Sequence, residues 1–463
     1  MKKVQLNIDD VFNLSGSIIY EPDKFKPVSF VTIDSRTVKR NSLFVAVKGK
    51  NFDGHDFVRD AVKKGSTAIV ITKNKLAQFD DINVPIITVK DTIIALGEIA
   101  YAWRKKLNTK VIGITGSAGK TTVKDMLAEL LKEKYSVNKT IANNNNNIGV
   151  PITILSTSKN HDVLVAELGT NHFGEIPYTS KILSPDYGLL TNIGNSHLEF
   201  LQSKNGVWKE KSFLFDETIR NKGKVFLNYD DPIIKAKHSA KGKKVSYGFN
   251  SKVNVKGTIK SFTDDGRTLM QISSRNKKNT VLFPLYGEQN AKNFLAACAV
   301  ALELGLSFNE INRGINRLKA PSGRLDVNCY KNFVLIDDTY NSNPDSAKAA
   351  IELVSRIKLF NRKILLLGDM LELGEKSIKL HKELKNVILN SGISEVYTIG
   401  SKMKFLHIEL IDKKITAKHF TSRDKLAGFI KNSDLNNSVI LVKGSRGMKM
   451  EEFLPAIKIK SSN

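Results

Sequence analysis

The chain contains the sequence VIGITGSAGKTTVKDMLAEL at residues 111–130, where three structural signals follow one another. Val111 to Thr115 is a short apolar run of the kind that forms a buried strand. A glycine loop, Gly116 to Lys120, follows it, and from Thr121 to Tyr135 the apolar residues recur at helical spacing on one face. A strand, a glycine loop and a helix in this order is the setting that a phosphate-binding loop requires. The segment therefore predicts a nucleotide site in an α/β domain.

The residues of this loop suit a triphosphate. Glycines let backbone N–H groups close around phosphate oxygens, and the N-terminus of the following helix favours negative charge. We expect Lys120 to neutralise the β- and γ-phosphates and Thr121 to bind Mg²⁺. An ordinary Walker A loop has glycine where this chain has Ile114, so the loop is a variant. The predicted ATP contacts here are Gly116, Ser117, Ala118, Gly119, Lys120, Thr121 and Thr122.

Strand-like and helical runs alternate along the chain, which predicts an α/β fold with parallel sheets covered by helices. A compact domain usually holds about 100 to 200 residues, so 463 residues suggest three domains. We expect a small α/β domain at residues 1–90, a central P-loop ATPase domain with a parallel sheet at 91–318, and a doubly wound, Rossmann-like domain at 319–463. Ala320 to Gly323 is a breaker cluster that makes a hinge. Residues 245–285 predict an antiparallel patch late in the central domain.

Two polar residues follow predicted strands, where the open edge of a parallel sheet gathers ligand-binding groups. Glu167 ends an apolar run that begins at Val163, and a carboxylate beside a phosphate loop can hold Mg²⁺. His197 follows the run from Tyr187 to Thr191. Taken alone, Glu167 fits a helix cap better than a metal ligand, and His197 fits an ordinary surface or core histidine better.

The composition excludes several classes of protein. Lys and Arg number 72 against 46 Asp and Glu, a net charge of +26, which invites a nucleic-acid interpretation. The lysines are spread along the chain, however, and a lysine-rich solvated surface, which also attracts anionic substrates, explains them better. Cys298 and Cys329 have no metal-ligand spacing and fit a reducing cytoplasm. No stretch approaches the about 18 apolar residues of a membrane span, so we expect a cytoplasmic protein that binds neither membrane nor nucleic acid.

The variant loop resembles that of the Mur ligase family, which builds the peptide of the bacterial cell-wall precursor. Other segments carry the resemblance over nearly the whole chain, in the same order: residues 147–151, 167–169, 192–194, 197–199, 287–290, Asn293, 321–325 and 337–344. Residues 337–344, 368–374 and 443–451 resemble the family member that adds a D-alanyl-D-alanine dipeptide. One departure is Gln289, where many relatives have histidine.

The resemblance implies an activity. It implies an ATP-dependent ligase that joins D-alanyl-D-alanine to the terminal carboxylate of a UDP-N-acetylmuramoyl-tripeptide through an acyl phosphate, with ATP and two Mg²⁺ ions. The first domain then binds the UDP-sugar, the third completes the ATP site and binds the dipeptide, and we expect a monomer. A sister ligase that adds a single amino acid, or glutamate to folate, is the nearest alternative. A nucleic-acid-stimulated P-loop ATPase and a uridine-sugar-binding protein with an inactive loop are more distant ones.

The resemblance also assigns roles to single residues. Thr121 and Glu167 hold the first Mg²⁺, while His197 and Lys211, the latter as a carbamate formed with CO₂, hold the second. Lys209 is the near alternative to Lys211. The implied catalytic residues are Lys120, Asn147, His197 and Lys211, with Asn147 on the transferred phosphate or on metal-bound water.

The remaining implied contacts come from the first and third domains. Further ATP contacts are Asn290, Asn293, Arg324 and Asp338. The UDP-substrate contacts are Ser35, Arg36, Asp53, Gly54 and His55, with Ser35 and Arg36 the foremost candidates and a capping turn the alternative. His172 is either a contact of the substrate peptide or a loop histidine. The histidines without metal-type pairing, expected at the surface, are His161, His238, His381, His407 and His419.

Overall fold

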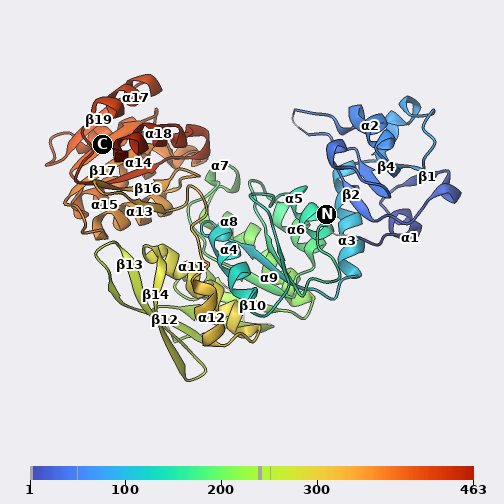
Figure 1. Cartoon of the computed structure of the whole chain (residues 1–463), viewed down its shortest axis with the longest axis horizontal. Coiled ribbons are helices and arrows are strands. Elements are labelled where there is room, and N and C mark those ends of the chain that lie inside the picture. The colour runs from blue at the N-terminus through green and yellow to red at the C-terminus, as the bar shows by residue number, and fades with distance from the viewer. Residues whose placement is uncertain (1–3, 50, 238–241, 251, 463) are drawn as a thin grey trace.

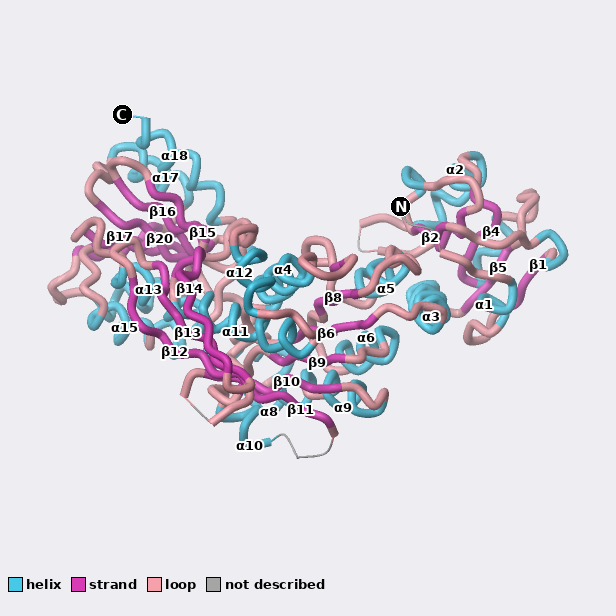
Figure 2. Tube along the Cα trace, turned by 60° about the horizontal axis from the view of Figure 1, so that its bottom comes forward, coloured by secondary structure: helices cyan, strands magenta, loops and turns pink. Residues whose placement is uncertain are grey.

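The computed structural model describes residues 4–49, 51–237, 242–250 and 252–462, and His238 lies outside them. The chain forms three α/β domains that follow one another along a bent row, each with its own sheet (Figure 1). Figure 2 shows the N-terminal domain at one end of this crescent and the C-terminal domain at the other. The fold class predicted from the alternating pattern is therefore confirmed, while the domain boundaries stay predictions.

The N-terminal domain has a five-stranded sheet in the order β1 (Ile18–Tyr20), β5 (Ile86–Val89), β4 (Ser66–Thr72), β3 (Ser42–Val45) and β2 (Phe30–Thr32), with β1 antiparallel. Its helices are α1 (Ile8–Phe12) and α2 (Val58–Lys63). Helix α3 (Thr92–Lys105) follows, and its buried Leu96 and Ile99 belong to a core shared with the central domain. The N-terminal domain thus packs against the central domain through α3.

The central sheet has nine strands, in the order β14 (Lys277–Tyr286), β13 (Arg267–Ser274), β12 (Val255–Phe262), β11 (Lys243–Gly248), β10 (Lys224–Asn228), β9 (Tyr187–Leu190), β6 (Lys110–Thr115), β8 (Val163–Glu167) and β7 (Val137–Lys139). The pairs β12–β13 and β13–β14 are antiparallel and the others are parallel. The antiparallel patch that the sequence predicts is confirmed, with its turn at Asp264 to Gly266.

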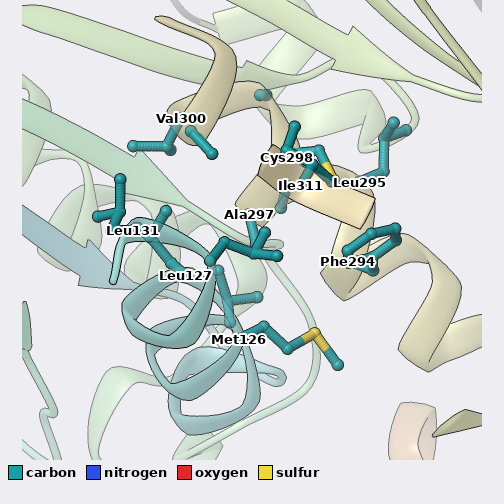
Figure 3. Close-up of a cluster of buried hydrophobic side chains, with 14 of the residues drawn as sticks. Met126, Leu127, Leu131, Phe294, Leu295, Ala297, Cys298, Val300 and Ile311 are labelled. Carbon is teal, nitrogen blue, oxygen red and sulfur yellow. The ribbon is translucent and has the colours of Figure 1, made fainter. Parts of the chain in front are cut away.

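Helix α4 (Lys120–Leu131) begins at the P-loop and is held from behind by α11 (Glu288–Glu303) and α12 (Phe308–Ile315). Figure 3 shows Met126, Leu127 and Leu131 of α4 meeting Phe294 and Ala297 of α11 in one buried cluster. This apolar support holds α4 against α11 behind the P-loop. The other helices of the domain are α5 (Gly149–Leu155), α6 (Glu175–Leu183), α7 (Leu198–Leu201), α8 (Lys204–Lys211), α9 (Phe213–Arg220) and α10 (Pro232–Lys237).

The C-terminal sheet runs β15 (Asp326–Cys329), β16 (Phe333–Asp338), β20 (Ser438–Lys443), β17 (Arg362–Gly368), β18 (Glu395–Ile399) and β19 (Thr416–Phe420), with only β15 antiparallel. Alternate residues of β16 enter two different cores, Val334 on one face and Leu335 on the other. Helices therefore cover both faces, as expected of a doubly wound domain. These helices are α13 (Pro344–Arg356), α14 (Ser377–Lys382), α15 (Leu384–Asn390), α16 (Met403–Leu410), α17 (Arg423–Asn432) and α18 (Leu454–Lys458).

Two of the histidines expected at the surface are buried, so that expectation was wrong for them. His161 is 3% exposed and its Nδ1 accepts the Ser158 amide. His381 is fully buried and its Nε2 accepts the Met370 amide at 2.9 Å. Each ring accepts a hydrogen bond from a backbone amide, that of the partly buried Ser158 or that of the buried Met370, and this role carries no periodic signal.

Candidate active site

A cavity of about 580 Å³ lies between the central and C-terminal domains. The P-loop, the end of β8, the loop after β9, the start of α11 and several C-terminal loops line it. The predicted site residues among its lining are Ser117, Ala118, Gly119, Lys120, Thr122, Asn147, Glu167, His197, Asn290, Asn293, Arg324 and Asp338. Gly116, Thr121 and Lys211 are not among the lining residues. Groups that are up to 221 positions apart in the sequence, such as Ser117 and Asp338, thus share one cleft.

Gly116 and Gly119 of the P-loop lie so close to neighbouring side chains that neither position has room for a Cβ atom. Gly116 has φ 150°, and a Cβ there would clash with Thr191 Oγ1. Gly119 has φ 81°, and a Cβ there would clash with the side-chain amide of Asn293 on α11. Any other residue at these positions would be strained as well as crowded. The loop is therefore packed tightly between β9 and α11.

Part of the loop's hydrogen-bonding capacity is used inside the protein. The amides of Ser117 and Ala118 donate to Asn192 O and Oδ1, both at 3.0 Å. The first turn of α4 has N–H groups without a helical acceptor, which favour an anion at this end. Lys120 Nζ donates to Gly116 O at 2.9 Å, and burial, partly offset by Glu167, lowers the pKa of Lys120. Lys120 and the start of α4 therefore form the phosphate-facing part of the site.

Glu167 is the acidic centre of the cleft. It is 1% exposed at the end of β8, its Oε1 accepts Asn145 Nδ2 at 2.8 Å, and its buried Oε2 has no hydrogen-bond partner among the described residues. Asn147, the asparagine selected from the sequence, is exposed at the edge of the cavity. Asn145 was missed, because a run of five asparagines gives no sign of which one lies against Glu167, 22 positions later in the chain.

Lys211 lies behind the cleft at the end of α8. It is 1% exposed and its Nζ has no partner among the described atoms, whereas the alternative Lys209 is exposed to solvent. Burial, together with the positive charge of Lys120, lowers the pKa of Lys211 well below its ordinary value. A buried neutral amine is the form of lysine that reacts as a nucleophile. The geometry therefore favours Lys211 over Lys209.

Glu210, which the sequence analysis did not select, connects α8 to the loop beside the cavity. Its side chain is 1% exposed and accepts the amides of Ile176 at 2.7 Å and Gly174 at 2.9 Å. Both amides belong to the N-terminal end of α6, where a carboxylate is favoured by the helix dipole. Glu210 thus fixes α8, and with it Lys211, against the start of α6.

Replacing Glu210 by Gln should destabilise the fold. A glutamine offers only one acceptor oxygen, so its NH₂ group must face one of the two amides and leave a buried donor unsatisfied. That costs about 1 to 3 kcal/mol, and more because the native bonds are charge-assisted. Chemical denaturation should show this loss for Glu210→Gln but not for Glu199→Gln, an exposed carboxylate on the neighbouring α7. Equal stability of both variants would contradict the role of Glu210.

His197 meets the C-terminal domain directly. Its Nδ1 lies 2.7 Å from Glu372 Oε2, and this contact lowers the pKa of Glu372. The Glu372 carbonyl also accepts the amide of Glu199, and Asp345 Oδ2 accepts the amide of Asn195 at 3.0 Å. Two carboxylates of the C-terminal domain therefore contact the loop that carries His197. Neither Asp345 nor Glu372 could be selected from the sequence, because their role depends on how the two domains meet.

His172 also lines the cavity, and its exposed ring lies 4.4 Å from the ring of Phe200. The loop that carries it is fixed by Glu175, whose Oε2 accepts the amide of Asn171 at 2.7 Å. This geometry is compatible with a contact to a substrate peptide, which stays a prediction.

The nucleotide-facing residues come from both domains. Asn290 and Asn293 are buried on α11, and Asn290 Nδ2 donates to Tyr286 O. The Arg324 guanidinium stacks on the ring of Tyr340, with its Cζ 3.9 Å from the ring centroid. Both residues line the cavity, and the stacking holds the planar guanidinium in place there. Asp338 accepts the Leu325 amide and pairs with the buried Lys443, another residue that the sequence analysis did not select.

In the N-terminal domain, the five predicted UDP contacts differ in availability. Both ring nitrogens of His55 have partners inside the domain, Asp53 Oδ1 and the Thr72 amide, so the ring has no unused position for a diphosphate. A Cβ at Gly54 would clash with the Val47 backbone. These contacts correspond to the capping turn that was the alternative interpretation. Ser35 is buried, whereas Arg36 extends into solvent beside Asp34.

The donor set fits Mg²⁺ that arrives with phosphate. Glu167 Oε2 has no hydrogen-bond partner among the described residues, and a carboxylate oxygen is the kind of ligand that Mg²⁺ prefers. Within the described ranges, no three His, Cys, Asp or Glu side chains are arranged to hold a metal by themselves. Mg²⁺ is typically held by one or two carboxylates plus substrate phosphates, so a small protein ligand set is what a nucleotide site requires. None of the described helices is long and apolar enough to cross a membrane.

Three family models match the chain in order. Residues 27–104 match the Mur ligase family catalytic domain, residues 114–301 the Mur ligase middle domain, and residues 323–446 the Mur ligase glutamate ligase domain. Each model falls on one of the three sheets described above, although β1 and most of β6 lie outside the matched ranges.

Whole-length relatives agree with these models. The UDP-N-acetylmuramoyl-tripeptide–D-alanyl-D-alanine ligase of Bacillus subtilis is 34% identical over 92% of both chains, and that of Haemophilus influenzae is 36% identical over 95% of both. Among solved structures, MurF from Acinetobacter baumannii superposes with a TM-score of 0.88 at 28% identity over 99% of both chains. MurF from Thermotoga maritima in complex with ADP has a TM-score of 0.81 at 28% identity, covering 94% of this chain and 98% of its own.

Proposed function

The chain belongs to the Mur ligase family, and from this premise we propose that it joins D-alanyl-D-alanine to a UDP-N-acetylmuramoyl-tripeptide at the expense of ATP. Its relatives that match over more than nine tenths of both chains bear the name of this ligase. The observation that carries the proposal is the shared cleft. Lys120 at the start of α4, Glu167 at the end of β8 and His197 in the loop after β9 line it together with residues of the C-terminal domain. The sister ligases and the P-loop ATPase stimulated by nucleic acid are not favoured.

The chemistry requires activation of a carboxylate. A carboxylate is a poor electrophile because its oxygen would leave as oxide. Transfer of the γ-phosphoryl group of ATP to that oxygen gives an acyl phosphate and ADP. The dipeptide amine then attacks the acyl carbon, an amide forms through a tetrahedral intermediate, and phosphate leaves. Positioning and charge stabilisation supply most of the acceleration in such phosphoryl transfers.

The residues divide this work. Lys120 and the first turn of α4 stabilise negative charge on the β- and γ-phosphates. Glu167 and Thr121 would hold one Mg²⁺, and His197 with Lys211 a second; bound there, the ions would screen the repulsion between phosphate and carboxylate. The contact with Glu372 occupies only Nδ1 of His197, so Nε2 is the ring nitrogen that would face the ion.

The remaining contacts complete the substrate sites. Arg324 and Asp338 bring phosphate and ribose contacts from the C-terminal domain, and Asn290 and Asn293 reach the nucleotide from α11. Asn147 is proposed near the transferred phosphate, beside the Asn145 that orients Glu167. The N-terminal domain would bind the UDP-sugar through Ser35 and Arg36. We also propose that the enzyme works as a monomer in the cytoplasm.

The proposal is tested by the amine that stimulates ADP release. Purified protein, ATP, Mg²⁺ and UDP-N-acetylmuramoyl-tripeptide, with either L-lysine or diaminopimelate at the third position, should release ADP rapidly only when D-alanyl-D-alanine is added. D-alanine alone, L-lysine and D-glutamate are the matched amines, and single-stranded DNA and RNA are the controls for a nucleic-acid-stimulated ATPase. Stimulation by a single amino acid and not by the dipeptide would assign the chain to a sister ligase.

Carbamylation of Lys211 is proposed because its buried amine has no hydrogen-bond partner in the part of the chain that the structure describes, and because its pKa is lowered. Reaction with CO₂ turns this amine into an anionic oxygen ligand. Removing bicarbonate and CO₂ should therefore lower kcat several-fold, reversibly on re-addition, while Lys209→Ala behaves as wild type in both conditions. Lys211→Ala should lose both the activity and the response to bicarbonate. Activity of the wild-type enzyme that is indifferent to bicarbonate would contradict the carbamate.

A further inference from the structure

Lys124 is a buried lysine that the proposed chemistry does not use. It lies one helical turn after Lys120 on α4, is 1% exposed, and faces the same strand end as Lys120 does. Its Nζ lies 3.4 Å from Ala142 O, 3.5 Å from Asp125 Oδ1 and 4.0 Å from Glu167 Oε2. A fully buried cation needs an anion nearby, so its partner has to be identified.

Two carboxylates are within reach, and one is already engaged. Asp125 Oδ1 accepts a 2.7 Å bond from Lys139, a partly exposed lysine on β7. Glu167 Oε1 is bonded to Asn145, but its Oε2, the atom nearest to Lys124, has no hydrogen-bond partner among the described residues. Lys124 is therefore the buried positive charge next to Glu167 Oε2, the oxygen that would coordinate a metal ion.

This arrangement sets the charge that an incoming cation meets. Two lysines, Lys120 and Lys124, carry positive charge next to the single carboxylate of Glu167. The neighbouring Asp125 is paired with Lys139 and adds no net charge, so a free Mg²⁺ ion would approach more positive than negative charge. ATP reverses the balance because its phosphates carry several negative charges to the same end of α4. At separations of a few ångströms in a buried site, one unit of charge changes an affinity by at least about tenfold.

We propose that Lys124 is a positioning residue that holds Glu167 for the metal and keeps this carboxylate from binding free Mg²⁺, so that the metal is bound only together with ATP. The inference rests on the proposed ligase function, because that function places Mg²⁺ on Glu167. It also gives a role to a buried lysine whose ion pairs with described residues are no shorter than 3.5 Å. The consequence is ordered binding, with the nucleotide carrying the metal into the cleft.

The test measures metal binding without turnover. Mn²⁺ binding to the full-length protein is followed by electron paramagnetic resonance, with and without ADP, for wild type, Lys124→Met and Lys124→Arg. Without nucleotide, we expect Lys124→Met to bind Mn²⁺ at least about tenfold more tightly than wild type, whereas Lys124→Arg, which keeps the charge, should resemble wild type. Lys139→Met is the matched control, since it removes a neighbouring cation that does not face Glu167.

The possible results distinguish a failure of the inference about Lys124 from a failure of the proposed ligase function. Adding Glu167→Gln to Lys124→Met should abolish the gained Mn²⁺ affinity. If Lys124→Met and Lys139→Met both bind Mn²⁺ as wild type does, the inference is overturned. The Mn²⁺ signal is also compared between the ADP complexes of Glu167→Gln and of wild type. If the two signals are the same, the metal role of Glu167 in the proposed function fails instead. Should Lys124→Met not fold, Lys124→Gln provides the neutral variant, and thermal melts verify each protein before measurement.

Discussion

Replacing Lys120 by Ala is expected to lower kcat by about a thousandfold while leaving the dissociation constant of the UDP-N-acetylmuramoyl-tripeptide within about twofold of wild type. Lys120 projects from the start of α4 into the cavity, and its ammonium is the group best placed to follow charge as it develops on the transferred phosphoryl. The UDP-sugar is proposed to bind in another domain, so its affinity should not depend on this lysine.

Two measurements check this split. Steady-state ADP release gives kcat, and isothermal titration with the UDP-tripeptide in the absence of ATP gives the dissociation constant. Lys132→Ala is the control, because Lys132 lies just beyond the end of the same helix and pairs with Glu129 at the surface. A Lys120→Ala enzyme that retains more than a tenth of wild-type kcat would remove the P-loop from the mechanism.

The P-loop could be predicted from sequence because its signal is local. The strand, the glycines and the helix that opens at Lys120 are adjacent in the chain, and each has its own periodicity or steric requirement. Glu167 could be found for the same reason, since it ends an apolar run.

What could not be predicted depends on contacts across the fold. Asn145 holds Glu167 although the resemblance selected Asn147, because one asparagine in a run is distinguished only by where the backbone turns. Glu372 reaches His197 through the meeting of two domains. His55 was selected as a ligand residue, yet its ring closes a turn, since a short Asp–Gly–His segment has the same appearance in both roles.

Replacing Glu167 by Gln is the second change with a large expected effect, a loss of about a thousandfold in kcat. The amide has nearly the same shape as the carboxylate but carries no charge, so the metal loses its buried anionic ligand and Lys124 loses its counter-charge. Asn145→Ala should cost much less, about tenfold, because it removes the residue that orients Glu167 and leaves the charge in place. Steady-state ADP release at saturating substrates measures both.

Asp125→Asn separates a metal effect from a general loss of charge near Lys124. Asp125 lies 3.5 Å from the same lysine but is not among the residues that line the cavity, so its neutralisation should change kcat by less than about threefold. If Glu167 acts by holding Mg²⁺, the Mg²⁺ concentration that gives half-maximal rate should also rise for Glu167→Gln and stay constant for Asp125→Asn. A purely structural carboxylate would not change the dependence of the rate on Mg²⁺. Equal losses of kcat in the two variants, with the same Mg²⁺ dependence, would therefore mean that Glu167 serves the packing of α4 against β8 and not the reaction.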